Sequence, residues 1–210
     1  MGTPGKEQNK LIALASIAAV LHGVKDVAWG VSLAAKNAKV ISAQAGDKGL
    51  GFKPITNFID EISQQAMKDV NEISDVAMKL SRISVCEQRS QNAYRHFAAV
   101  RGKNNNAPYI DSLVQATESV ENNMLAITRD FKTTFNQLLS LLDTMDENML
   151  SARALASVSR IVTANAQEYR AKLEVVANDL EDAANYIKGK VQDSYHHLNT
   201  VKSMTSQRIA

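Results

Sequence analysis

The sequence has a single cysteine, Cys86, among its 210 residues. One thiol cannot form an intramolecular disulfide, so a disulfide-stapled secreted scaffold is excluded and a cytoplasmic setting is expected. Cys86 follows Val85 within a helical pattern, and we interpret it as a structural thiol rather than a reactive one.

Residues that interrupt helices are also scarce, with three prolines and nine glycines, and aromatic residues make up only 5% of the chain. The common residues are good helix formers such as Ala, Leu, Lys, Gln and Glu. No stretch shows the repeated alternation of apolar and polar residues that is typical of strands. The composition therefore predicts an all-α protein with helices well above average length.

No uninterrupted apolar run reaches the roughly 20 residues that a membrane-spanning helix needs. The most apolar run, from Leu11 to Leu21, is about half that length, so we expect no membrane span. The formal net charge of +2 is close to neutral. A general affinity for nucleic acid is therefore not expected.

Two long amphipathic segments flank a cluster of glycines. Apolar residues recur in steps of three and four on both sides of the cluster, which is the a/d pattern of a coiled coil. They are Leu14, Ile17, Leu21, Val24, Ala28, Val31, Ala35 and Ala38 before it, and Ile55, Ile59, Ile62, Ala66, Ile73, Val76, Leu80 and Ile83 after it. Gly46, Gly49 and Gly51 interrupt the pattern, and glycine supplies the positive φ of a tight reversal. The sequence thus predicts a helical hairpin with these glycines forming its turn.

The stretch from Asn37 to Phe52 reads NAKVISAQAGDKGLGF. This order of residues resembles the hairpin tip of the cytoplasmic signalling domain of methyl-accepting chemotaxis proteins, and the similarity runs without gaps over about residues 24–73. Leu50 and Pro54 replace an Arg and a Val of the family pattern. The residues that shape the turn are kept while several charged residues are lost, which favours the hairpin geometry more strongly than ordinary receptor partners.

The resemblance implies a soluble signal-transduction protein of chemotaxis whose tip contacts a histidine kinase and a coupling protein. The residues at the positions of the family's tip contacts are the expected partner-binding residues: Trp29, Leu33, Asn37, Val40, Asp47 and Phe52. Trp29 stands where the family has Phe. A competing interpretation places Trp29, Leu33 and Val40 in the hairpin core, because aromatic residues at helical spacing are most often core residues. Phe52 is expected to pack under the turn in either case.

The remaining pattern predicts four long helices. We expect them at residues 8–45, 53–100, 109–142 and 149–203, with a loop from Arg101 to Pro108 and a turn from Asp143 to Asn148. Together they predict an elongated four-helix coiled-coil bundle of long antiparallel hairpins, residues 1–102 and 103–210, within a single domain. The bundle could close on itself as a monomer, or the tip hairpin could pair with its copy. We expect a homodimer.

No chemical site emerges from the polar residues. His196 and His197 are adjacent, so on a helix they point about 100° apart and cannot bind one metal ion together. The paired acids Glu118 with Glu121, and Glu181 with Asp182, are typical of a solvated helix face. No nucleophile–base pair or phosphate-binding loop is present. We therefore expect no catalytic residue, no metal and no cofactor, and a protein that is not an enzyme.

Two other functions stay open. The chain could be a structural or interaction coiled-coil protein that keeps only the hairpin geometry and serves a different partner. It could also be a helical effector that inserts Leu11 to Leu21 into membranes, although that apolar run is short. Gln64 and Gln65 lie too near the turn to match receptor methylation sites, so no adaptation site is expected.

Overall fold

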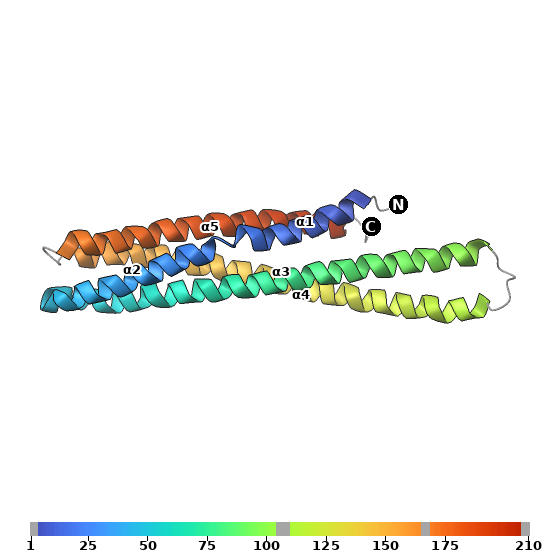
Figure 1. Ribbon diagram of the computed structural model, residues 1–210, viewed down its shortest axis with the longest axis horizontal. Coiled ribbons are helices and arrows are strands. Elements are labelled where there is room, and N and C mark those ends of the chain that lie inside the picture. The colour runs from blue at the N-terminus through green and yellow to red at the C-terminus, as the bar shows by residue number, and fades with distance from the viewer. Residues whose placement is uncertain (1–3, 104–109, 165–168, 207–210) are drawn as a thin grey trace.

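The computed structural model describes residues 4–103, 110–164 and 169–206 of the chain. Its elements are α1 (Pro4–Val20), α2 (Val24–Gln44), the short 3-10 segment η1 (Gly46–Phe52), α3 (Lys53–Lys103), α4 (Ile110–Thr163) and α5 (Arg170–Ser206). The described residues contain no strand. The predicted all-α class is confirmed, and the helices pack together as a bundle (Figure 1).

The bundle is organised along the two longest helices. α3 and α4 lie side by side, while α1 and α2 together cover α3, and α5 covers α4 (Figure 1). η1 joins α2 to α3 at the same end of the bundle where α4 gives way to α5. The two turn regions therefore meet, with Val162 of α4 lying against Gly51 of η1.

One hydrophobic core runs through the bundle and draws on all five helices. On α4 its buried residues follow steps of three and four without interruption: Phe131, Thr134, Leu138, Leu142, Met145, Met149, Ala152, Ala156, Ser159 and Thr163. A helix with such a narrow apolar stripe is not stable alone in water. Each helix therefore depends on its neighbours for stability. The division of the chain into two hairpins, residues 1–102 and 103–210, remains a prediction.

The first helix was expected to be continuous from Gln8 to Ala45, and this is wrong. α1 ends at Val20, and the chain tightens before α2, where His22 N donates to Ala19 O at 3.2 Å and Val24 N donates to Leu21 O at 3.1 Å. Gly23 keeps a right-handed φ of −71°. The hydroxyl oxygen of Tyr186 on α5 lies 2.8 Å from where a Cβ on Gly23 would stand, so glycine permits a close approach here.

The turn expected from Asp143 to Asn148 is also wrong, because α4 continues through it to Thr163. Met145 and Met149 are fully buried and continue the apolar stripe. The acids that suggested a turn lie away from the core, where Asp143 accepts a hydrogen bond from the Tyr195 hydroxyl of α5. Burial, followed by that hydrogen bond, raises the pKa of Tyr195, which keeps the phenol protonated. The last helix consequently begins at Arg170 instead of Met149.

The other helices do not cover α3 and α4 along their whole length. Residues 85–102 of α3 and 113–130 of α4 contain no fully buried side chain, and the two helices continue past the ends of α1 and α5 (Figure 1). The predicted loop from Arg101 to Pro108 falls largely on residues 104–109, which lie outside the described residues.

A buried ion pair lies where the covered part of the bundle ends. Lys10 of α1 is only 3% exposed, and its Nζ lies 2.7 Å from Oε2 of Glu87 on α3. The same Nζ lies 4.0 Å from the centroid of the Phe131 ring on α4. One cation thus joins three helices through an ion pair and a cation–π contact.

The segment Gln8–Gln44 is apolar and long enough to cross a membrane by length and composition, with a mean hydropathy of 1.7 in its most apolar window. Core helices of soluble proteins meet the same criterion, and Leu14, Ile17, Leu21 and Val24 of this segment are buried in the bundle. The expectation that the chain does not span a membrane therefore stays a prediction.

Candidate protein-interaction site

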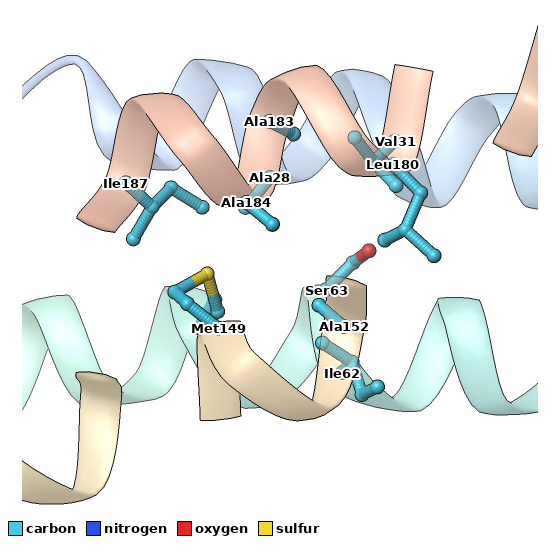
Figure 2. Close-up of a pocket in the computed structure, with 11 residues that line it drawn as sticks. Ala28, Val31, Ile62, Ser63, Met149, Ala152, Leu180, Ala183, Ala184 and Ile187 are labelled. Atoms are coloured by element: carbon cyan, nitrogen blue, oxygen red, sulfur yellow. The ribbon is translucent and has the colours of Figure 1, made fainter. Parts of the chain in front are cut away.

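Among the described residues, one cavity between the helices is too small for a ligand. Side chains of α2, α3, α4 and α5, among them Ala28, Ser63, Met149, Ala152 and Ile187, converge on a small apolar cavity (Figure 2). Its volume is about 10 Å³. Since a single water needs about 10–15 Å³ and several polar partners, the cavity is a packing imperfection. This cavity is therefore not a candidate for a ligand site.

The turn at the end of α2 is shaped by two of the predicted glycines. Gly46 has a φ of 57°, in the left-handed region that favours glycine. Gly49 is buried against the end of α2, and a Cβ at this position would lie 2.3 Å from the carbonyl oxygen of Ser42. The hydroxyl of Ser42 donates to the carbonyl oxygen of Gly49 at 2.5 Å. This contact ties the turn to α2.

Gly51, the third predicted turn glycine, has a different role. A Cβ at this position would lie 3.2 Å from Cγ1 of Val162, and among the described residues only Gly46 is a glycine with positive φ. Gly51 therefore allows α4 to approach the turn closely. Asp47 lies exposed within η1.

Phe52 was expected to contact a partner, but it is only 1% exposed and belongs to the core. Its side chain packs beneath the turn and offers no surface to another protein. The prediction of a direct contact for Phe52 does not fit this position, because the ring would first have to leave the core. Phe52 instead supports the turn from below.

Three large apolar side chains lie exposed on α2. Trp29 is 61% exposed, Leu33 is 43% exposed and Val40 is 59% exposed. Their spacing of four and seven residues places them within about 40° of one another around a helix with 3.6 residues per turn. With the neighbouring exposed Asn37, they form what we call the α2 face. The interpretation that places Trp29, Leu33 and Val40 in the core is wrong.

An aspartate holds α2 to α3 beside this face. Oδ1 of Asp60 accepts a hydrogen bond from the Ser32 hydroxyl at 2.5 Å, and Oδ2 accepts one from Nε2 of Gln64 at 3.1 Å. Nζ of Lys36 lies 4.0 Å from the same carboxylate. The sequence pattern alone assigned no role to Asp60. Its role depends on the approach of Ser32, which a single sequence does not reveal.

The described polar residues are not grouped as a metal site requires. Within residues 4–103, 110–164 and 169–206, no group of three or more His, Cys, Asp or Glu side chains is placed to hold a metal ion. His196 and His197 lie with their ring centroids 6.1 Å apart in an edge-on arrangement. Cys86 is exposed, so its interpretation as a packed structural thiol is wrong. The absence of enzymatic activity stays an expectation.

Comparison with known proteins gives no match: no family model matches the chain, and neither a curated protein nor a solved structure is significantly similar to it. The class that the fold and the surface define is an all-helical bundle with an exposed apolar face beside a glycine turn. The likeness to chemoreceptors rests on the residues of the turn and its flanks alone.

Proposed function

We propose that this chain is a cytoplasmic, chemoreceptor-like signal-transduction protein that binds a histidine kinase or a coupling protein of a chemotaxis array. The contact surface is the α2 face together with Asp47. The observation that carries this proposal is the exposure of Trp29, Leu33 and Val40 on one face of the helix that leads into the glycine turn. These are the positions where the resemblance places partner contacts.

Two properties of the α2 face support its proposed role as a binding surface. Tryptophan is enriched among residues that dominate binding energy, because its large rigid ring buries much area at a small entropic cost. The underlying helix is joined to α3 by the hydrogen bond that the Ser32 hydroxyl donates to Asp60. A partner would therefore meet a preformed surface and order little of the chain on binding.

We further infer that the helices form antiparallel hairpins with coiled-coil packing, in which α4 and α5 occupy the place that a second hairpin takes in a receptor dimer. The steps of three and four between buried residues on α4 support this inference. Signals would then pass as small changes in helix packing, with no chemistry performed by the chain.

The homodimer remains part of the proposal, and the two uncovered segments of α3 and α4 are the surface it would use. A dimer should give a solution mass twice the 22.9 kDa of the chain in light scattering combined with size-exclusion chromatography. A mass that stays at that of one chain across the accessible concentration range would remove the homodimer and leave the proposal for the α2 face intact.

Replacing Trp29 by Ala should weaken binding of the coupling protein or the kinase by roughly 30-fold, since a central aromatic contact contributes about 2 kcal/mol. Isothermal titration calorimetry with each purified partner measures the change. Because Trp29 is largely exposed, thermal unfolding of the variant should match that of the parent chain within about 0.5 kcal/mol.

Val158→Ala is the matched control, because Val158 is an exposed apolar residue of α4 outside the α2 face. Its binding should equal that of the parent chain. The proposal would be abandoned if neither chemotaxis protein bound the parent chain at high concentration, or if Trp29→Ala bound as tightly as the parent.

A second candidate is an interaction coiled coil with an unrelated partner. It is favoured by Leu150 and Ile161, which also lie exposed on one side of α4. Replacing both by Ala while keeping Trp29 separates the two candidates. Loss of a partner's binding in this double variant, with binding retained in Trp29→Ala, would assign the function to α4.

A further inference from the structure

A groove runs between α2 and α5. Asp60 contacts a different side of α2, through Ser32. Val27, Gly30 and Val31 line it from α2, and Ala183 and Tyr186 line it from α5. The space in front of Gly30 is open, since a Cβ added there would meet nothing within 4 Å. The absence of a side chain at Gly30 thus leaves room for another element to approach α2 closely.

Two carboxylates border this apolar groove. Asp179 and Asp182 are three residues apart on α5, so they lie on one side of the helix. Among the described residues neither forms an ion pair. Nζ of Lys190 lies 5.5 Å from the centroid of the Tyr186 ring and pairs with Asp193 at 3.6 Å. Burial, followed by repulsion from Asp182, raises the pKa of Asp179. A cation placed between the two carboxylates would offset the repulsion between them.

We propose that the groove binds an amphipathic helix of a partner protein, one that carries Lys or Arg residues along the edge of its apolar side. A helix laid between two helices completes a three-helix contact through its apolar side chains. Its cations would pair with Asp179 and Asp182, while the acidic border disfavours nucleic acid and anionic membranes. The groove is formed by other residues than the α2 face. This proposal therefore does not rest on the proposed binding of a chemotaxis protein at Trp29.

The expected contact is small and therefore of moderate affinity. The residues of the groove extend over about two helical turns of α5, from Asp179 to Tyr186. A partner helix of three or four turns would cover this length. Exposed ion pairs contribute about 0.2–1 kcal/mol each, so the apolar contact at Gly30 must supply most of the specificity.

A fluorescein-labelled amphipathic peptide of leucine and lysine, roughly 14 residues or four turns long, is a direct probe. The full chain should raise its fluorescence anisotropy at physiological salt. A peptide with glutamate in place of lysine should bind more weakly, because its carboxylates are repelled by Asp179 and Asp182. Equal binding of both peptides would overturn the proposal, because the acidic border would then have no influence.

Two variants test the groove itself. Gly30→Leu should fold, because the space there is open and leucine favours helix over glycine, and it should weaken binding of the lysine peptide at least tenfold by filling the groove. The double variant Asp179→Asn with Asp182→Asn should weaken binding about three- to tenfold through the lost ion pairs.

Matched controls separate a specific groove from general charge attraction. Gly102→Leu makes the same change at an open glycine of α3, far from the groove. Glu118→Gln with Glu121→Gln removes the same charge from exposed positions of α4. Both should bind the lysine peptide as the parent does. If the controls lose as much binding as the groove variants, the proposal is overturned. A change in the solution mass of the chain caused by Gly30→Leu would also overturn it, because the groove would then be occupied by a second copy of the chain.

Discussion

Replacing Gly49 by Ala should destabilise the chain by roughly 3 kcal/mol, which is the largest effect expected of a single methyl group in this protein. The added Cβ would lie 2.3 Å from the Ser42 carbonyl oxygen and 2.9 Å from the Cβ of Ala45. Ser42 lies in the last turn of α2 and Ala45 caps that helix, so no flexible side chain can move aside. The strain must be relieved by opening the turn and breaking the hydrogen bond between Ser42 and Gly49.

Differential scanning calorimetry measures this effect as a fall in Tm of roughly 6–12 °C for a chain of this size. Gly30→Ala is the control, because its added Cβ meets nothing within 4 Å. This control should be neutral or more stable by up to about 1 kcal/mol. A Gly49→Ala variant that melts with the parent chain would show that the turn does not press against α2.

Replacing Lys10 by Met should cost roughly 3 kcal/mol, even though methionine is close to lysine in shape. Lys10 is buried and lies 2.7 Å from Glu87, which is itself only 14% exposed. Removing one partner of a buried ion pair leaves the other in a poorly solvated place without its counter-charge. The cation–π contact with Phe131 is lost as well.

A double-mutant cycle with Glu87→Gln isolates this interaction. In urea denaturation, Glu87→Gln alone should also destabilise the chain. The double variant should recover most of the loss, because replacing both charges by neutral groups of similar size is often nearly neutral. Strictly additive effects of the two substitutions would contradict the picture of one buried pair that joins α1 to α3.

Much of the fold follows from the spacing of apolar residues. The stripe from Leu14 to Ala38 predicted which side of the first segment is buried, and those residues are buried. The same stripe excludes Trp29 and Leu33, so their exposure could have been predicted from it. The competing assignment of these residues to the core gave weight to residue type over position.

Breaks between helices were predicted less well, because they depend on residues distant in sequence. Gly23 is held in a helical conformation, and the reason for glycine there is the hydroxyl of Tyr186 on α5. The acids from Asp143 onward resemble a helix start, yet they lie outside the core stripe that Met145 and Met149 continue. The first fact requires knowing that α5 lies beside Gly23, whereas the second could have been predicted from the spacing of Met145 and Met149.

The surface features were the least predictable. Asp60 gains its role only when α2 places Ser32 within 2.5 Å of it. The groove beside Gly30 likewise requires α5 to bring Asp179 and Tyr186 next to α2. In both places the contributing residues were visible in the sequence, but their proximity arises from packing between helices about 30 and 150 residues apart.

The most direct test of the proposed function uses the one tryptophan of the chain, Trp29. Incorporating 5-fluorotryptophan gives a single ¹⁹F resonance that reports only on the α2 face. When the chemotaxis coupling protein or kinase is added, this resonance should shift or broaden and lose its accessibility to solvent, because the exposed ring becomes buried at the interface. An unchanged resonance in a sample where the complex has formed would contradict the account, since binding would then take place elsewhere on the bundle.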